Sequence, residues 1–203
     1  MSRYTGPRVR VMRALGCDLP GFSRKKIDRR PYPPGQHGQA RHKLSEYKLR
    51  LIEKQKLRFG YGVSEVQLRR LMVEAGRSQG APGDKLVELL ERRLDNVVFR
   101  AGFARTIPAA RQLVCHGFVH VNGRRVDIAS FRVDQGHTIS LVPRVWKNPH
   151  VLSSVADETM ERASWLNVDK AAFSATVTAL PDASSALFPV DVQRVVEFYS
   201  LRL

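Results

Sequence analysis

The stretch 84–133 constrains the fold more than any other part of the chain, because two helical patterns and a tight-turn signal follow one another in it. Apolar residues between positions 86 and 101 recur at intervals of three and four, which predicts one amphipathic helix. Thr106 is expected to cap a second helix. The dipeptide Asn122-Gly123 suits the two positive φ angles of a type I′ turn. The sequence therefore predicts two helices followed by a β-hairpin.

Arginine dominates the polar positions of this stretch, and the chain has no lysine between Arg92 and Arg144. A guanidinium group can hold a phosphate through two hydrogen bonds or stack on a base, so the pattern favours structured RNA as the partner. The alternative is a solvated basic face with a few acidic neighbours. The residues expected to contact RNA here are Arg92, Arg93, Asn96, Arg100, Arg111, Gln112, His116, Asn122 and Arg124.

The net charge of +15 is concentrated at the N-terminal end of the chain. Residues 1–58 hold 16 Lys and Arg against 4 Asp and Glu, whereas residues 151–203 hold 4 against 7. This gradient indicates that one end contacts a polyanion and the other faces protein or solvent. No apolar run approaches the roughly 20 residues that span a bilayer, so we expect a soluble protein with no membrane partner.

Residues 1–43 are predicted to form an extended basic arm, because they combine many cations with prolines and glycines and few apolar residues. Proline holds such a chain open, and glycine lets its backbone approach a phosphate. The alternative is a flexible tail. Within the arm, the expected RNA contacts are Arg3, Tyr4, Arg8, Arg30, Tyr32, Gln36 and His37, with the aromatic rings stacking on bases.

The run LERRLDNVVFRAGFARTIPAARQLVCHGFVHVNGRRVDIASF resembles the small RNA-binding module of the small-subunit ribosomal protein four family. Similar modules occur in some pseudouridine synthases, a tyrosyl-tRNA synthetase and a heat-shock RNA-binding protein, so the module alone indicates only RNA. Segments 2–8, 29–38 and 53–70 also resemble this family, as do WLNVDK, SATVTALP and VEFYS near the end. The resemblance covers nearly the whole chain and is to the bacterial type.

Bacterial members of this family often carry four cysteines in the arm that bind zinc. Here the corresponding region holds only Cys17, so we predict no metal and no cofactor. Cys115, the other thiol, is expected to be buried beside Val114. The LPGFSRK stretch that stands in place of the cysteines leaves a plastid-encoded origin open beside a cytoplasmic, ribosomal one.

The expected fold is α+β, with a mostly helical first domain and a helix-helix-hairpin module continued into a small mixed sheet. Helices are predicted over 45–61, 64–76, 153–165 and from Asp191 onward, and strands over 130–133, 138–142 and 173–179. The resemblance implies that the last helix returns to the first domain. The predicted domains are the arm 1–43, a helical domain of 44–83 with 190–203, and the module 84–189 with its core at 92–142.

An enzyme is not expected, although Arg93-Leu94-Asp95 matches the core around the catalytic aspartate of some pseudouridine synthases. Here the motif lies inside the module's first helix, so a surface pairing of Asp95 with an arginine is the preferred interpretation. The alternative functions are an RNA-modifying enzyme and a ribosome-rescue stress factor with the same module.

The resemblance implies a structural protein that binds small-subunit ribosomal RNA, nucleates assembly of the body of the subunit and contributes to translational accuracy. It further implies contact with ribosomal protein five, and with messenger RNA at the entrance channel through Arg41 and Lys43. No homo-oligomer is expected.

Overall fold

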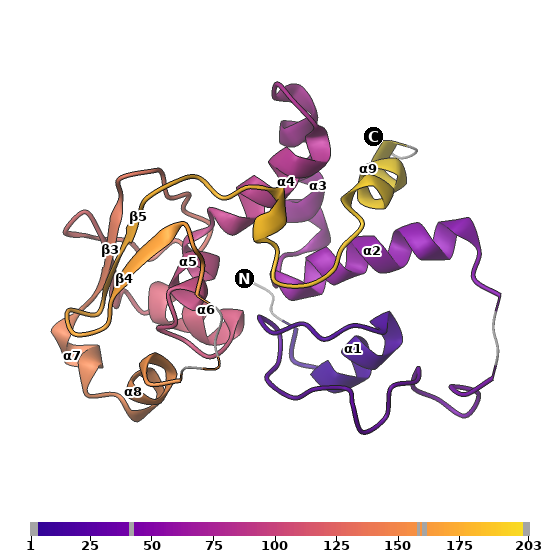
Figure 1. Ribbon diagram of the computed structural model, residues 1–203, viewed down its shortest axis with the longest axis horizontal. Helices are drawn as coiled ribbons and strands as arrows, with labels where there is room; N and C mark the ends of the chain where they lie inside the picture. Colours follow the sequence, from indigo (N-terminus) through magenta and orange to yellow (C-terminus); the bar gives the residue numbers. More distant parts are fainter. Residues whose placement is uncertain (1–3, 41–42, 158, 160–161, 201–203) are drawn as a thin grey trace. The chain divides into compact units, whose positions relative to one another are not determined.

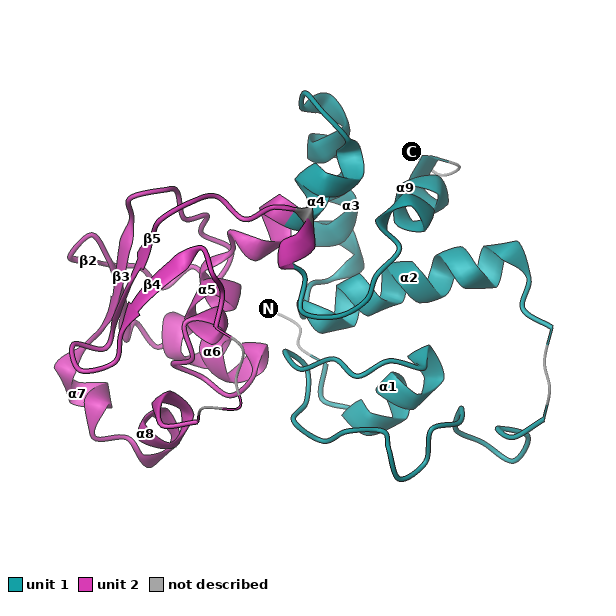
Figure 2. Cartoon of the chain, viewed as in Figure 1, with its two compact units in different colours: residues 1–87, 186–203 teal, residues 88–185 magenta. Residues whose placement is uncertain are grey.

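The computed structural model describes residues 4–40, 43–157, 159 and 162–200. The chain forms two compact units (Figures 1 and 2). Unit 1 consists of the residues up to 87 together with those from 186 onward, and unit 2 of residues 88–185. The described part of unit 1 is helical, whereas unit 2 combines helices with a five-stranded antiparallel sheet. The predicted α+β class is confirmed.

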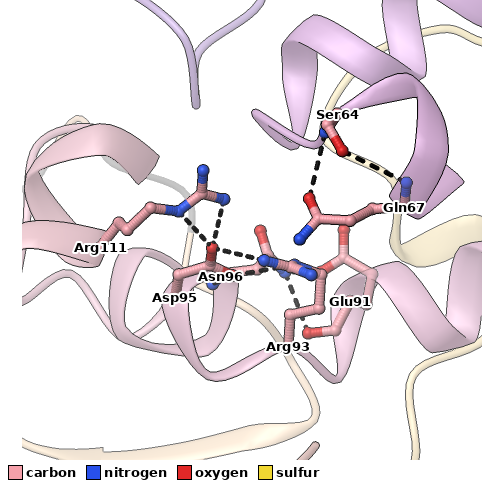
Figure 3. Close-up of polar contacts among 7 residues, drawn as sticks. All are labelled: Ser64, Gln67, Glu91, Arg93, Asp95, Asn96 and Arg111. Atoms are coloured by element: carbon pink, nitrogen blue, oxygen red, sulfur yellow. Dashed lines mark hydrogen bonds and ion pairs between the residues drawn. The ribbon is translucent and has the colours of Figure 1, made fainter. Parts of the chain in front are cut away.

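Three helices of unit 1, over 46–60, 65–77 and 192–200, lie close to the positions that the sequence predicts. Ser64 and Gln67 form the expected capping box, because the Ser64 hydroxyl accepts from the Gln67 N–H at 3.3 Å and Gln67 Oε1 accepts from the Ser64 N–H at 3.1 Å (Figure 3). Asp191 caps the last helix by accepting from the Arg194 N–H. The elements are α1 Arg8–Leu15, α2 Glu46–Gly60, α3 Glu65–Arg77, the first part of α4 Pro82–Glu91, and α9 Val192–Ser200.

The last helix, α9, packs on α2 and α3 although more than a hundred residues separate them in the chain. Its Val195 and Phe198 are buried on the inner side. At the edges of this contact, Arg50 Nε lies 2.8 Å from Glu197 Oε2, and the Tyr199 hydroxyl donates to Glu65 Oε1 at 2.9 Å. The two ends of the sequence therefore share one helical core.

The Glu65 carboxylate at this contact makes the stability of unit 1 depend on pH. Burial raises the pKa of Glu65, but the hydrogen bonds from Lys54 and Tyr199 outweigh it and leave that pKa below its ordinary value. The stabilisation is therefore complete above the unfolded pKa of about 4.3 and is lost as the pH falls through the folded pKa. We expect Glu65→Gln to flatten this acid limb in urea unfolding measured at a series of pH values. An acid limb as steep as that of the unaltered protein would contradict the assignment.

The basic arm is not wholly extended, which corrects the prediction for residues 1–43. Residues 8–15 form α1, and Gly16 ends it with a φ of 65°. The helix forms because Met12 is fully buried next to α2, where Leu19 and Phe22 also lie inside. A few apolar residues suffice here because they pack on another helix instead of on one another.

Unit 2 is built around its sheet, whose strands lie in the order β2-β1-β3-β5-β4. The register aligns Val121, Ile139 and Ala175 in one buried row. Asn122 and Gly123 have φ values of 49° and 76°, so the predicted type I′ turn is confirmed. The strands are β1 Val119–Val121, β2 Arg124–Arg125, β3 Thr138–Leu141, β4 Leu166–Asp169 and β5 Ser174–Val177. The helices are α5 Leu94–Arg100, α6 Ile107–Cys115, α7 Pro143–Trp146 and α8 Pro149–Val155, with a short 3-10 turn at Ala183–Ser185.

The single helix predicted over 86–101 is instead two helices, because α4 ends at Glu91 and α5 begins at Leu94. At the break, the Leu94 N–H donates to the Phe131 carbonyl at 2.8 Å, and the Val133 N–H donates to the Arg92 carbonyl at 2.9 Å. The predicted strand over 130–133 is therefore also wrong. Backbone groups of that segment bond to residues at the break between the two helices, and the segment forms only an isolated β-bridge, between Arg93 and Arg132.

Two further predictions in unit 2 are corrected. The helix expected over 153–165 is replaced by α8, which ends at Val155, and residues 158, 160 and 161 lie outside the described part. Strand β4 follows, where the sequence predicts the end of a helix. Cys115 is exposed at the end of α6, because the apolar stripe of that helix turns Val114 inward and its neighbour outward. No helix in the described ranges is long and apolar enough to cross a membrane.

Two glycines in helices of unit 1 differ in what surrounds them, and this difference gives a matched stability test. A Cβ at Gly60 would lie 2.4 Å from Cζ of the buried Phe188, whereas a Cβ at Gly76 would meet nothing within 4 Å. We expect Gly60→Ala to destabilise the protein by about 1–3 kcal/mol through overpacking. Gly76→Ala should stabilise it by about 0.5–1 kcal/mol. Urea unfolding of both variants checks this, and equal effects would contradict the packing described.

Candidate nucleic-acid interface

The hairpin and the end of α6 carry several exposed polar side chains of unit 2. Gln112 and His116 are exposed on and just after α6, and Arg124 and Arg125 are exposed on β2. The Arg125 guanidinium lies over Gly117, where a Cβ would come within 2.2 Å of its Nε. The φ of 72° at Gly117 favours glycine at the end of α6, and the lack of a Cβ leaves room for this arginine. We call Gln112, His116, Asn122, Arg124 and Arg125 the hairpin face.

Asn122 supports the hairpin as well as belonging to its face. Its side-chain oxygen accepts from the Thr138 N–H at 2.9 Å, which ties the turn to the neighbouring strand. Next to it, His120 pairs across the strands with Arg125 and with Ser140, so the three side chains share one face of the sheet. The backbone that carries Arg124 and Arg125 is thus part of the sheet.

A second set of polar residues lies inside unit 2, around the break between α4 and α5 (Figure 3). Asp95 has no solvent exposure. Its carboxylate accepts from Arg93 Nε at 3.1 Å and Nη2 at 2.8 Å, and from Arg111 Nε at 2.9 Å. Because Arg111 belongs to α6, this ion pair ties α6 to α5. The expected surface pairing of Asp95 is therefore wrong, since the pairing is buried.

Glu91, also without solvent exposure, neutralises the other buried donors of this region. Asn96 Nδ2 donates to Glu91 Oε2 at 2.7 Å and to the Glu91 carbonyl at 3.0 Å. Arg100 Nε lies 3.5 Å from Glu91 Oε2, and Arg100 Nη2 donates to the Ser185 carbonyl. Two buried acids thus pair with three arginines within the unit, and Arg111, whose side chain is 16% exposed, is the one of the three that reaches solvent most.

The residues predicted to contact RNA in this unit therefore fall into two groups. Arg93, Asn96 and Arg100 are buried, and Arg111 directs its Nε and Nη2 at Asp95. Arg92 pairs with Glu88 at 2.9 Å and with Asp134. These guanidinium groups already have protein partners, among them the carboxylates of Glu88, Glu91, Asp95 and Asp134. Gln112, His116, Asn122 and Arg124 are exposed, and Arg125 joins them.

In the arm, several predicted contact residues have protein neighbours. The Tyr4 ring packs against Phe22 at 5.7 Å and Phe59 at 5.3 Å between ring centres. Arg8 Nη1 donates to the Phe22 carbonyl at 3.1 Å. Tyr32 has the guanidinium of Arg13 over its ring. The other predicted residues, Arg30, Gln36, His37 and Lys43, are exposed, while Arg3 and Arg41 lie outside the described residues.

Residues 4–40 and 43 of the arm do not supply the donors of a zinc site. Zinc takes four ligands in such sites, and thiols bind it as thiolates. Cys17 is buried, and burial raises the pKa of its thiol, which disfavours the thiolate. In the described ranges, no group of three or more His, Cys, Asp or Glu side chains is placed to hold a metal ion. The described residues of the arm therefore do not fit a metal.

Three residues with a defined place in these sites were not expected from the sequence. Arg13 organises the arm, Arg125 belongs to the hairpin face, and Glu91 neutralises the buried donors. A signal for Glu91 is present, because an acid falls among the leucines of an apolar stripe. For Arg13, the signal is its position in the last turn of α1, the helix that Gly16 ends.

The sequence matches two family models that lie side by side along the chain. Residues 3–91 match the Ribosomal protein S4/S9 N-terminal domain, and residues 92–139 match the S4 domain. Curated proteins named small ribosomal subunit protein uS4 are similar over their full length and that of this chain. Examples are those of Methylobacillus flagellatus at 56% identity, Nitrosomonas europaea, there named uS4B, at 52%, and Synechococcus elongatus at 50%.

Proposed function

The chain belongs to the family of small ribosomal subunit protein uS4, and from this membership we propose that it is a non-catalytic constituent of the small ribosomal subunit that binds ribosomal RNA. The observation that carries the proposal is the hairpin face, where Arg124 and Arg125 are exposed on β2 directly after the type I′ turn. Planar guanidinium groups hold phosphates through two hydrogen bonds, and this supplies affinity and orientation. The shape of the folded RNA supplies specificity.

The arm provides the second RNA-binding surface in this proposal. Arg30, Gln36, His37 and Lys43 are exposed along an irregular stretch of backbone rich in proline and glycine. Such a backbone can follow an RNA groove closely, since it presents cations and amides without bulky regular structure. The excess of basic residues in 1–58 supports this surface.

The finer roles of the protein belong to the same proposal. It nucleates assembly of the body of the subunit, contributes to translational accuracy, contacts ribosomal protein five and lies beside messenger RNA at the entrance channel. The resemblance of nearly the whole chain to the family supports these roles, and the exposure of Lys43 suits the last of them. The cytoplasmic ribosome is the proposed location. Units 1 and 2 are proposed to be its two folding domains.

Removing two cations from the hairpin face tests RNA binding directly. We expect Arg124→Gln with Arg125→Gln to weaken binding to purified small-subunit ribosomal RNA. The slope of log affinity against log salt should become shallower by roughly 1.4–1.8, because each lost phosphate contact contributes about 0.7–0.9. The matched control removes two exposed cations elsewhere in unit 2, as Arg144→Gln with Lys147→Gln. Equal losses in the two double variants would show that only net charge matters and would reject the hairpin face.

A further inference from the structure

We propose that Arg13 is a positioning residue that fixes the shape of the basic loop 24–36 through hydrogen bonds to the backbone carbonyls of the loop. The inference rests on the proposed RNA-binding function, because this loop is part of the arm surface. Arg13 carries a positive charge, but its Nε and Nη2 donate to backbone carbonyls of the protein.

The guanidinium of Arg13 is bound by three backbone carbonyls of the loop. Its Nε lies 3.1 Å from the Arg30 oxygen and 3.0 Å from the Tyr32 oxygen, and its Nη2 lies 3.4 Å from the Pro33 oxygen. The same guanidinium stands over the Tyr32 ring, 4.9 Å from its centre. A planar group with five donors can hold several carbonyls at once, whereas an ammonium group concentrates its donors on one atom. The Arg13 side chain therefore contacts three carbonyls of one turn of the loop.

The base of this side chain is itself fixed. Arg13 follows Met12, which is fully buried, and lies in the last turn of α1 before Gly16 ends the helix. A second attachment closes the other side of the loop, where Asp18 Oδ1 accepts from the Ile27 N–H at 3.0 Å. The loop is thus tied to the helical part of unit 1 at two points.

Without these ties, the loop has little to order it. Residues 24–36 contain no helix or strand, and Ile27 is the only aliphatic side chain among them. Fixing the backbone of such a segment costs about 1–2 kcal/mol per residue, and an RNA would otherwise have to compensate that cost on binding. A loop that is already ordered presents Lys25, Arg29 and Arg30 at fixed positions.

A metal-bound cluster would order the loop through side chains, and the donor set for one is not present. Cys17 is the only thiol in the arm, and it is buried with its Sγ directed at the Asp18 carbonyl. Arg13 instead uses backbone carbonyls, which every residue provides. This explains how a loop with such a sequence keeps a defined shape.

Hydrogen exchange of the free protein tests the proposal without RNA. In Arg13→Gln, we expect amide exchange in peptides covering 24–36 to rise about tenfold or more, since opening of the loop no longer breaks three bonds. Arg10→Gln removes the same charge from an exposed position of α1 and should leave this exchange unchanged. Adding a chelator to the unaltered protein should also leave it unchanged. Arg13→Lys keeps the charge and should give an intermediate rise.

Two results would overturn the proposal: wild-type exchange of the loop in Arg13→Gln, or a rise caused by the chelator. If amide exchange in Arg13→Gln also rises in residues 8–15, the Arg13→Lys variant decides between the explanations. In that variant, faster exchange confined to residues 24–36 supports the proposal, and unchanged exchange there rejects it. RNA affinity is then measured for the same variants. Arg13→Gln should lose more affinity than Arg10→Gln. If both variants lost the same RNA affinity while the loop opened only in Arg13→Gln, the arm would not be the RNA-binding surface. The role of Arg13 in holding the loop would still be supported.

Discussion

Asp95→Asn is expected to destabilise unit 2 by about 3–5 kcal/mol, the usual result of removing one partner from a buried ion pair. Asparagine keeps the shape of the side chain but leaves Arg93 and Arg111 without the charge that balances them. Trp146 and Trp165 are the only tryptophans of the chain and both lie in unit 2, so tryptophan fluorescence during urea unfolding follows this unit. The midpoint of that transition should fall.

The control for this variant is Asp134→Asn, the same chemical change at the carboxylate that pairs with Arg92. The Asp134 side chain is 59% exposed, against 0% for Asp95. Exposed pairs contribute roughly 0–1 kcal/mol, so the control should barely move the midpoint. If the two variants behaved alike, the buried network would have no special part in holding α5 and α6 together.

Phe198→Ala is the second change with a large expected effect, at about 3–5 kcal/mol in unit 1. Phe198 is 4% exposed, and Lys54 Nζ stands 4.9 Å from the centre of its ring. Removing the ring opens a cavity between α9 and α2. Because unit 1 has no tryptophan, the loss should appear in far-ultraviolet circular dichroism and in the hydrogen exchange of α2 peptides, ahead of any change in tryptophan fluorescence.

Gln193→Ala, on the exposed side of the same helix, serves as the control and should change stability by less than about 0.5 kcal/mol. The pair also tests the proposal that the units are separate domains. If Phe198→Ala shifted the tryptophan transition as far as the dichroism transition, the two units would unfold as one, and the domain proposal would fail.

The parts of the fold that the sequence predicts correctly are those whose cause lies within a few residues. The turn at Asn122-Gly123 depends on the backbone freedom of two residues, and the capping box at Ser64 and Gln67 on two side chains three positions apart. The break between α4 and α5 has a distant cause. It depends on backbone partners at 129–133, which no window around the break contains.

The same distinction between local and distant causes applies to the candidate site. An excess of arginine is visible in the sequence and correctly indicates a nucleic-acid partner class, but composition does not say which arginines face outward. Arg93 and Arg124 are the same residue type in the sequence. In the structure, Arg93 donates to the buried Asp95, whereas Arg124 is exposed on β2. Sorting them requires the positions of the two buried acids, and those depend on how the helices pack.

The return of the chain to unit 1 determines the order in which the two units can be completed during synthesis. All residues of unit 2 precede residue 186, whereas the core of unit 1 needs α9, which begins at Val192. A ribosome makes proteins from the N-terminus, so unit 2 has its full sequence while α2 still lacks its partner helix. The part of the protein that is translated first is therefore the last to acquire its complete core.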